Sequence, residues 1–374
     1  MNHSLTLIVA GNPAQFTGGY IYDARIVTAL RQRGWEVEVI GLEGRFPEPD
    51  ATAAEALEKA LDQQPDGARV VIDGLALGGL PEVVAVHAKR LELTALIHHP
   101  LADETGLDQA QRTRFLLSET RALAAVDQVI ATSIFTARRL ADFNVAAERI
   151  AVIEPGVEPA PLSSRSNKTA QHSGDRPPEC QQLLCVATVI PRKGQDILID
   201  ALAKLRHYDW QCDLIGALDR DPQFAEKVTT LIHDHNLTDR IQLLGERPSE
   251  ALKTAYHNAD LFVLPSLYEG YGMVISEALA HGLPVVTTTG GALAHTLPQA
   301  AGLGVPPNDT QAMTEALRRW FNEPDLRQRL TQGAHRARDN LTDWQAAGDA
   351  FSKVLLSDSS GAANRGMTNE VADS

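Results

Sequence analysis

Residues 264–286, LPSLYEGYGMVISEALAHGLPVV, combine a buried strand, a glycine-rich turn and a helix in one short stretch. The apolar strand ends at Ser266, and Gly270-Tyr271-Gly272 follows as a turn whose glycines let the backbone come close to a ligand. The helix after the turn is stopped by Gly282-Leu283-Pro284 before the next apolar run begins. Backbone N–H groups at the start of such a helix attract anions, so the stretch predicts a phosphate site.

Two glutamates of this stretch are candidates for binding hydroxyl groups. Glu269 precedes the turn, and Glu277 lies eight positions later, inside the helix. Ionised carboxylates only accept hydrogen bonds, so they suit a ligand that presents hydroxyls, such as a sugar or a nucleotide ribose. The residues alone also allow a plainer interpretation, in which Glu269 caps the helix and Glu277 is a surface residue.

Outward from this stretch, short apolar runs alternate with segments of helical period, once in each half of the chain. Runs rich in Val, Ile and Leu without polar alternation are typical of strands buried on both faces of a parallel sheet. A β-α rhythm with right-handed crossovers gives a doubly wound α/β sheet, and its repetition predicts two Rossmann-like domains. The runs are Leu5–Ala10, Trp35–Leu42, Arg69–Asp73, Leu93–His99, Gln128–Ser133 and Ile150–Ile153 in the first half, and Leu183–Val189, Gln211–Gly216, Ile241–Gly245, Leu261–Ser266, Pro284–Thr288 and Leu303–Pro306 in the second.

Composition along the chain predicts where the two domains begin and end. We expect an N-terminal domain over residues 1–160, a polar linker or loop over 161–179 and a C-terminal domain over 180–340. Apolar residues at helical spacing predict a final helix within 341–357, but the spacing does not say which domain this helix covers. Small polar residues over 358–374 predict a disordered tail.

The net charge and the cysteine content exclude some classes of function. The 374 residues include 34 Lys and Arg and 48 Asp and Glu, a formal net charge of −14, which argues against general nucleic-acid binding. The three cysteines, Cys180, Cys185 and Cys212, form no CxxC pair, and this sparse, odd set fits a reducing cytoplasm. No apolar run approaches the ~20 residues of a membrane span, and the first residues lack a signal-peptide pattern. An exported or integral membrane protein is therefore not expected.

Residues 264–286 closely resemble the E-x7-E block of the family-4 retaining glycosyltransferases. The resemblance covers most of the chain and includes Gly18-Gly19, Gly34-Trp35-Glu36-Val37, Asp127–Ser133, Pro155-Gly156-Val157-Glu158, Leu183–Gly194, Ala259-Asp260 and Thr289-Gly290-Gly291. It implies the α/β GT-B fold, in which two Rossmann-like doubly wound domains face a central cleft that holds a nucleoside-diphosphate sugar. It also implies that no metal ion or other cofactor is needed, and we expect no DxD motif or His/Cys cluster in a position to hold one.

The resemblance also implies that the N-terminal domain is the acceptor side and that the C-terminal domain binds the nucleotide-sugar. It assigns roles to residues of the C-terminal domain. Glu277 would hold the ribose, and Glu269 the transferred sugar. Pro191-Arg192-Lys193-Gly194 reads as a basic strand-to-helix turn, where Lys193 and Arg192 would neutralise the donor diphosphate. The backbone amides that would bind sugar or phosphate are those of Gly270, Tyr271, Gly272 and Met273.

Two positions depart from the family pattern. Thr188 stands where an arginine is usual before the phosphate loop, so Arg192, four residues on, is expected to serve as the second cation. In Gly291-Ala292-Leu293-Ala294, no acid follows the double glycine, where one is common, and this leaves the contact of that loop open.

In the N-terminal domain, the resemblance points to a glycine loop and a histidine. Gly18 and Gly19 would form the ligand-binding loop after the first strand. His99, in His98-His99-Pro100 after the fourth strand, matches the family's histidine that reaches the donor sugar. We prefer His99 to His98 for this contact, and structural packing of His99 is the alternative.

A basic helix predicted over residues 109–126 could bind a membrane surface. Members of the family that glycosylate lipids bind membranes through a basic, apolar surface of this domain. The positive charges of the predicted helix are Arg112, Arg114 and Arg121. Glu119 and Asp127 dilute them, and the spacing suits a solvated helix face, so peripheral membrane contact is not favoured.

Together these patterns predict a cytoplasmic, metal-independent, retaining glycosyltransferase that moves a sugar, expected to be a hexose, from a nucleoside-diphosphate sugar to an acceptor. The resemblance implies a front-face mechanism, since no single protein nucleophile is evident. Two alternatives stay open: a nucleotide-sugar epimerase or hydrolase of the same fold, and a non-catalytic regulatory paralogue, which Thr188 alone supports. Short motifs do not encode the donor sugar, the base, or whether the acceptor is a sugar, a lipid or another small molecule.

Overall fold

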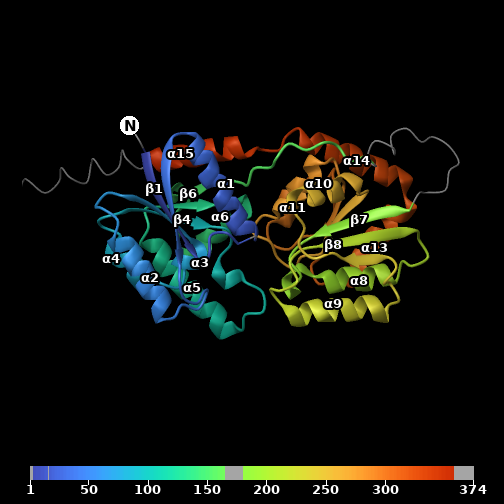
Figure 1. Cartoon of the computed structure of the whole chain (residues 1–374), viewed down its shortest axis with the longest axis horizontal. Coiled ribbons are helices and arrows are strands. Elements are labelled where there is room, and N and C mark those ends of the chain that lie inside the picture. Colours follow the sequence, from blue (N-terminus) through green and yellow to red (C-terminus); the bar gives the residue numbers. More distant parts are fainter. Residues whose placement is uncertain (1–2, 16, 165–179, 358–374) are drawn as a thin grey trace, which may run out of the picture. The chain divides into compact units, whose positions relative to one another are not determined.

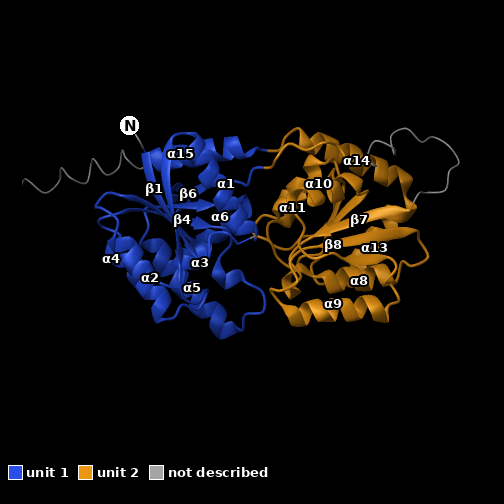
Figure 2. Ribbon diagram, viewed as in Figure 1, with its two compact units in different colours: residues 1–156, 342–374 blue, residues 157–341 orange. Residues whose placement is uncertain are grey.

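The computed structural model describes residues 3–15, 17–164 and 180–357, which fold into two compact units. The first unit contains residues 1–156 and 342–374, and the second contains residues 157–341 (Figure 2). Each unit is built on one parallel six-stranded sheet with helices on both faces (Figure 1). The predicted α/β class with two doubly wound sheets is confirmed, and every apolar run named above contributes a strand.

The sheet of the first unit has the strand order β2-β1-β3-β4-β5-β6. Ile8, Ile72 and Ala95 lie opposite one another across β1, β3 and β4 and are fully buried, which explains why these runs are apolar without alternation. The strands are β1 (His3–Ala10), β2 (Trp35–Leu42), β3 (Arg69–Asp73), β4 (Glu92–Ile97), β5 (Gln128–Ala131) and β6 (Ile150–Val152). The helices are α1 (Gly18–Gln32), α2 (Ala51–Asp62), α3 (Gly74–Leu77), α4 (Pro81–His87), α5 (Gln109–Ala124), α6 (Ile134–Arg139) and α15 (Trp344–Ser357).

The sheet of the second unit has the order β12-β11-β10-β7-β8-β9. Phe262 of β10 lies opposite Leu184 of β7 and Val285 of β11, and all three are buried. The strands are β7 (Gln181–Val186), β8 (Trp210–Ile215), β9 (Ile241–Leu243), β10 (Leu261–Leu264), β11 (Val285–Thr288) and β12 (Gly302–Val305). The helices are α8 (Gln195–Ala203), α9 (Pro222–Asp234), α10 (Ser249–Asn258), α11 (Met273–Ala280), α12 (Leu293–Thr296), α13 (Thr310–Asn322) and α14 (Pro324–Arg338). In Figure 1, α8, α9 and α13 cover one face of this sheet, and α10, α11 and α14 cover the other.

Both sheets have a point at which the chain reverses its direction of travel across the sheet. In the first unit this switch point lies between β1 and β3, and in the second it lies between β7 and β10. At a switch point the loops at the carboxyl ends of two adjacent strands diverge, which leaves a crevice for a ligand. The loops after β1, β3, β7 and β10 are therefore where a site is expected.

The C-terminal helix α15 packs on α1, so the first unit supplies the surface that the sequence left undecided. A Cβ atom on Gly348 would lie 2.5 Å from Cβ of Ala29, which shows how closely the two helices approach. The Trp35 indole donates to Ser352 Oγ at 3.0 Å, and Arg33 donates to Gln345 Oε1 at 3.0 Å.

The boundary between the units differs slightly from the expected one. Residues 157–164 belong to the second unit, because buried Ser163 donates to the carbonyls of His257 and Ala259 at 2.9 and 2.8 Å. The rest of the expected linker, 165–179, and the expected tail, 358–374, lie outside the described residues. Among the described residues, no helix combines the length and apolarity needed to cross a membrane.

Candidate functional site

The loop after β7 and the loop after β10 interlock at the switch point of the second sheet. Residues Pro191–Lys193 form a short 3₁₀ turn, and Gly194 follows it with a φ of +67°. A Cβ atom at Gly194 would lie 2.3 Å from the carbonyl oxygen of Pro265, so only glycine fits there. The Leu267 N–H donates to the Arg192 carbonyl at 2.7 Å and joins the same two loops.

Glu269 forms an ion cluster with Lys193 and Arg192. Lys193 Nζ lies 2.5 Å from Glu269 Oε1, and Arg192 NH1 lies 3.5 Å from Glu269 Oε2. Arg192 NH1 also donates to the Tyr268 carbonyl at 2.8 Å. The side chains are 11% to 18% exposed, so little water screens them. The sequence analysis assigned Glu269 to the sugar of a donor and the two cations to its diphosphate, and the structure brings these side chains into direct contact.

The charge state of this cluster follows from two opposing effects. Burial acts to raise the pKa of Glu269, but Lys193 and Arg192 outweigh it and hold that pKa at about 2. Burial also lowers the pKa of Lys193, and Glu269 opposes this shift. The cluster therefore holds an ionised carboxylate at neutral pH beside two basic groups, and an incoming anion would share those basic groups with it.

The backbone of Thr188 is held by a buried side chain of the same unit. The Thr188 carbonyl accepts from the buried Gln195 side chain at 2.9 Å. The strand exit before it packs on Gly216, where a Cβ would lie 1.9 Å from the Ala187 carbonyl oxygen. Arg192 is the arginine that this loop brings to Glu269, as the departure at Thr188 led us to expect.

The double glycine after β11 supports the backbone of Glu269. Gly291 pairs with Glu269 in an isolated parallel bridge, and the Ala292 N–H donates to the Glu269 carbonyl at 2.8 Å. A Cβ at Gly291 would lie 2.3 Å from the Glu269 carbonyl oxygen, and one at Gly290 would lie 2.1 Å from that of Leu267. This loop therefore contacts Glu269 through its backbone.

Helix α11 starts from the glycine-rich turn. Gly272 is its N-cap with a φ of +90° and offers no side-chain cap, so the N–H groups of the first turn, from Met273 onward, are not taken by a capping side chain. Tyr271 is fixed from two sides, since its carbonyl accepts from Thr296 Oγ1 at 2.5 Å and its hydroxyl lies 3.2 Å from Ser276 Oγ. The turn Gly270-Tyr271-Gly272 therefore connects Glu269 of the ion cluster directly to the positive end of α11.

Glu277 is held by a tyrosine that the sequence did not suggest. The hydroxyl of buried Tyr256 on α10 donates to Glu277 Oε2 at 2.8 Å, and the Tyr256 ring stacks on His281. Burial, and then the charge of Glu277, raise the pKa of Tyr256 well above its usual value, so the phenol stays a donor. The contact joins two helices across 21 positions, and no short pattern encodes it.

In the first unit, the glycine loop and the histidine pair come together. Helix α1 begins at Gly18, and a Cβ at Gly19 would lie 3.2 Å from the ring of His98, while nothing lies within 4 Å at Gly18. His99 Nε2 lies 3.2 Å from Glu104 Oε2. The histidine that Gly19 accommodates is therefore His98, which the sequence analysis had set aside.

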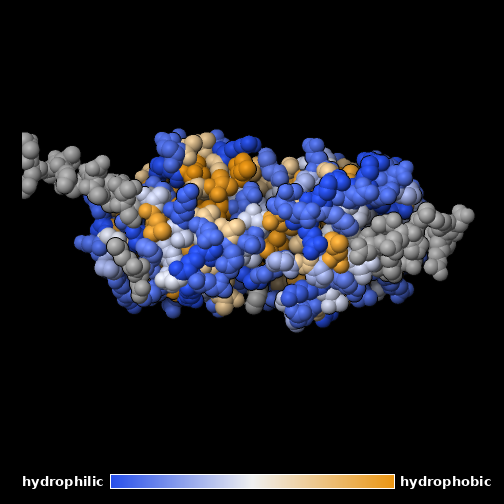
Figure 3. All heavy atoms as spheres, turned by 90° about the horizontal axis from the view of Figure 1, so that it is seen from above, coloured by the Kyte–Doolittle hydropathy of each residue, from blue (hydrophilic) through white to orange (hydrophobic). Residues whose placement is uncertain are grey.

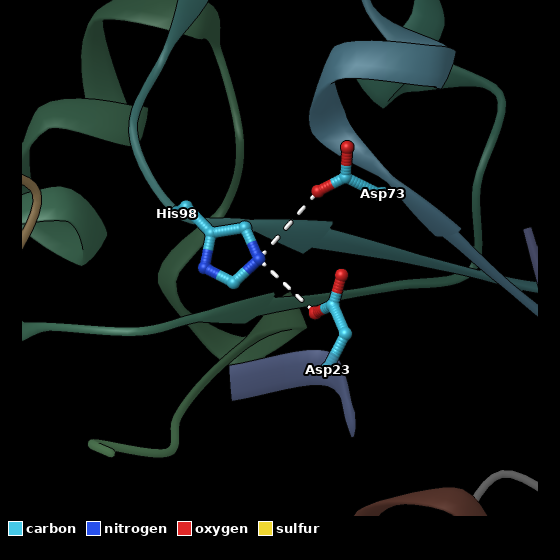
Figure 4. A group of neighbouring side chains, drawn as sticks. All are labelled: Asp23, Asp73 and His98. Carbon is cyan, nitrogen blue, oxygen red and sulfur yellow. Dashed lines mark hydrogen bonds and ion pairs between the residues drawn. The ribbon is translucent and has the colours of Figure 1, made fainter. Parts of the chain in front are cut away.

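His98 faces Asp23 of α1 and Asp73 at the end of β3 with one ring nitrogen, as Figure 4 shows. Its Nε2 is 3.1 Å from Asp23 Oδ1 and 3.5 Å from Asp73 Oδ2, and one ligating atom from each residue lies within 4.8 Å of the others. Three distant segments bring these side chains together, so the search of the sequence for a DxD motif or a His/Cys cluster did not identify this group.

The interpretation of helix α5 as a solvated face is wrong for Glu119. Glu119 is 2% exposed, and its two carboxylate oxygens accept from the Leu101 and Ala102 N–H groups at 2.7 and 3.0 Å. It therefore anchors the loop that follows His98-His99-Pro100. The three arginines of α5 do have partners: Arg114 pairs with Glu48, Arg121 pairs with Glu82, and Arg112 donates to the Ala102 carbonyl.

Two family models match the chain on either side of the unit boundary. One is described as Glycosyltransferase Family 4 and matches residues 20–160, and the other is described as Glycosyl transferases group 1 and matches residues 167–337. The chain belongs to the family-4 glycosyltransferases. The resemblance seen in the E-x7-E block is thereby confirmed.

This glycosyltransferase is 28% identical over 262 residues to the D-inositol 3-phosphate glycosyltransferase of Salinispora arenicola, a match that covers 63% of the chain and 56% of that relative. It is 25% identical over 322 residues to the MMP alpha-(1->4)-mannosyltransferase of Mycolicibacterium hassiacum, covering 80% of the chain and 73% of that relative. The matched region thus spans little more than half the length of the first of these relatives.

Solved structures share the fold of the glycosyltransferase. The sucrose-phosphate synthase of Thermosynechococcus elongatus aligns with a TM-score of 0.77 at 23% identity, covering 97% of the chain and 100% of that structure. The Anabaena protein HepE, in complex with UDP and glucose, aligns with a TM-score of 0.70 at 18% identity, covering 95% and 100%. At these identities the likeness concerns the fold alone, and it confirms GT-B.

Proposed function

We propose that this glycosyltransferase binds a nucleoside-diphosphate sugar on its second unit and transfers the sugar with retention of configuration. The observation that carries the proposal is the cluster of Lys193, Arg192 and Glu269 at the switch point of the second sheet. The loop that carries Glu269 continues into the glycine-rich turn at the start of α11. Two basic groups, a helix N-terminus and a hydroxyl-accepting carboxylate suit a phosphorylated sugar.

The proposed chemistry uses these groups where charge develops. When the bond between the sugar and the diphosphate breaks, negative charge grows on the leaving phosphate, and Lys193 and Arg192 are already in place to stabilise it. Glu269 accepts hydrogen bonds from hydroxyls of the transferred sugar, and Glu277, oriented by Tyr256, accepts from the ribose. A phosphate oxygen of the leaving group takes the proton of the acceptor on the same face, which retains configuration without a protein nucleophile.

The same arrangement supports transfer without a metal ion. Metals in phosphoryl chemistry neutralise charge on the diphosphate, and here two side chains and a helix end can do so. His99 is proposed to contact the donor sugar, and a hydroxylated small molecule or sugar is the proposed acceptor. The relatives named as inositol-phosphate glycosyltransferases and mannosyltransferases support an acceptor of that kind. Cys185 and Cys212 are buried free cysteines among the described residues, which supports the proposed place in the cytoplasm.

Nucleotide binding and product analysis test the proposal. Thermal unfolding is followed with UDP, GDP, ADP and TDP, and a nucleotide at 100 times its dissociation constant should stabilise the chain by ~2.7 kcal/mol. The responding base then selects the nucleotide-sugars to assay, and NMR of the product reports its anomeric configuration. Inverted product would refute retention, donor hydrolysis without transfer would indicate a hydrolase, and no response to any nucleotide would refute the donor site itself.

A further inference from the structure

One buried hydroxyl in the donor loops is left without a well-aligned hydrogen bond. Hydrophilic residues, which predominate on the face of the molecule shown in Figure 3, complete their hydrogen bonds with water, whereas buried polar groups depend on protein partners. Ser266, two residues after β10, is 0% exposed, and its Oγ completes no hydrogen bond of normal geometry with the described residues. An unsatisfied buried hydroxyl is costly, so its place in the proposed donor site calls for a reason.

The main chain on both sides of Ser266 is held in place. Its carbonyl accepts from Thr288 Oγ1, which in turn accepts from the Gly290 N–H at 3.3 Å. On the other side, the Leu267 N–H donates to the Arg192 carbonyl at 2.7 Å. The Ser266 hydroxyl can therefore change its partner by rotation of its own side chain, without movement of the loop.

The group on which this hydroxyl acts is the carboxylate of Glu269, three positions along the chain. Burial raises the pKa of Glu269, and Lys193, Arg192 and, with the smallest effect of the three, Ser266 lower it. The carboxylate oxygens have charged partners: Oε1 lies 2.5 Å from Lys193 Nζ, and Oε2 lies 3.5 Å from Arg192 NH1. Ser266 is thus the neutral donor beside a carboxylate whose shortest contact is with a lysine.

A bound diphosphate would change this balance. In the proposed function Lys193 binds the donor phosphate, so the ligand competes with Glu269 for the same ammonium group. The Glu269 side chain is 11% exposed, and a buried carboxylate that loses a charged partner is destabilised unless another donor replaces it. Ser266 has a donor in the same loop whose hydrogen bond is not yet made.

We infer that Ser266 is a positioning residue, whose hydroxyl donates to the Glu269 carboxylate when the donor diphosphate draws Lys193 away. The inference rests on the proposed function, because a ligand needs phosphate groups to compete for Lys193. The new hydrogen bond keeps Glu269 oriented toward the hydroxyls of the transferred sugar. Lys193 is then free to stabilise the charge that grows on the leaving phosphate. The cost of the unsatisfied hydroxyl in the free enzyme is recovered in the complex.

The stability of the free chain gives the first test. Ser266→Ala removes an unsatisfied hydroxyl, so we expect an unchanged or higher Tm. Ser163→Ala is the matched control, because Ser163 is equally buried in the same unit and its Oγ donates to two backbone carbonyls at 2.9 and 2.8 Å. Its Tm should fall by about 2–4 °C. A fall as large in Ser266→Ala would overturn the inference, since the hydroxyl would then be bonded in the free enzyme.

Nucleotide binding gives the second test, by calorimetry on the full chain. The ligands are the nucleoside diphosphate among UDP, GDP, ADP and TDP that stabilises the wild type, and its nucleoside without phosphate. Ser266→Ala should weaken the diphosphate by about tenfold, the size of a hydrogen bond to a charged group, and change the nucleoside by less than about threefold. In a Lys193→Ala background the lysine is absent in both states, so Ser266→Ala should cost no further affinity for the diphosphate.

Three results would overturn the inference: equal losses for the diphosphate and the nucleoside, no loss for either, or the same tenfold loss in the Lys193→Ala background. The first and third would indicate a merely structural role for Ser266. The wild-type chain separates this inference from the proposed function. If a diphosphate binds the wild type and Ser266→Ala equally well, only the inference fails, whereas a wild type that binds none of the four diphosphates would refute the donor site itself.

Discussion

The ammonium group of Lys193 lies 2.5 Å from the carboxylate of Glu269. The cation proposed to bind the donor phosphate and the carboxylate proposed to bind the donor sugar therefore form one ion pair. Their positions in the chain are 76 residues apart, and the interlocked loops after β7 and β10 bring them together. A donor that enters this site must share Lys193 with Glu269. In the proposed reaction, the pair would thereby link recognition of the sugar to stabilisation of the leaving group.

Lys193→Ala and Arg192→Ala should each slow transfer by about 30- to 1,000-fold. Removing a preplaced charge from a water-poor site costs roughly 2–4 kcal/mol of transition-state stabilisation. Steady-state rates with the nucleotide-sugar found by thermal shift provide the measurement. Lys253→Ala is the matched control, since Lys253 is 57% exposed and pairs with surface Glu250, and less than a threefold change is expected there. A near-normal Arg192→Ala enzyme would show that the loss of arginine at Thr188 is compensated elsewhere.

Tyr256→Phe should weaken nucleotide binding with little loss of stability. The change removes the hydroxyl that donates to Glu277 and keeps the ring that stacks on His281. We expect a loss of roughly 1–2 kcal/mol, about 5- to 30-fold in dissociation constant, by calorimetry. Glu277→Gln should have an effect at least as large, and the double variant should cost less than the sum of the two. Additive losses would argue that Tyr256 does not act through Glu277.

Gly291→Ala should damage the donor site more than a glycine substitution of equal backbone strain elsewhere. Gly291 and Gly245 have φ values of +64° and +67°, but a Cβ at Gly291 meets the Glu269 carbonyl oxygen at 2.3 Å, whereas at Gly245 the nearest atom is 3.9 Å away. Both variants should lose about 1–2 kcal/mol to the left-handed conformation. Gly291→Ala alone should also lose nucleotide-sugar binding, measured by calorimetry. Equal binding in the two variants would contradict the role given to the double glycine.

Glu119 should make the first unit less stable as the pH rises. Burial raises the pKa of Glu119 to about 7 from 4.5, so the folded chain holds this proton more tightly than the unfolded chain does. The stabilisation is complete below about pH 4.5 and is lost as the pH approaches 7, a total of about 3 kcal/mol. Calorimetry from pH 5 to 8 should show a flatter dependence in Glu119→Gln, whose constant cost comes from one lost backbone hydrogen bond. Parallel curves for variant and wild type would refute the assignment.

Excess EDTA should leave transfer intact. The basic groups that face Glu269 belong to Lys193 and Arg192, and the Asp23–Asp73–His98 cluster lies in the other unit. Initial rates before and after chelation, and after added Mg²⁺ or Mn²⁺, are the measurement. Complete loss of activity that either ion restores would refute metal-independent transfer.

Features set by local sequence patterns could be predicted from the sequence, and features set by contacts between distant segments could not. Apolar runs report burial on both faces of a sheet, so the strands were predictable, and the E-x7-E stretch reports backbone shape through its glycines. Tyr256 and Asp23 left no such signal, because each meets its partner only after helices or strands have packed. Glu119 was misinterpreted for a related reason: on a helix with several arginines it looks solvated, but its partners are two backbone N–H groups of another loop. The contact between Gly19 and His98 was not predicted, because a motif cannot say which of two adjacent rings packs against the loop.

The packing of α15 on α1 has a consequence for biosynthesis. The ribosome completes all six strands of the first unit early, yet the covering helix Trp344–Ser357 emerges only after the whole second unit has been translated. Until then, the face of α1 that Gly348 approaches at Ala29 stays open to chaperones and proteases. A premature stop codon anywhere in the second unit would therefore also leave this face of α1 without its covering helix. Cellular quality control would then act on the first unit as well as on the truncated second unit.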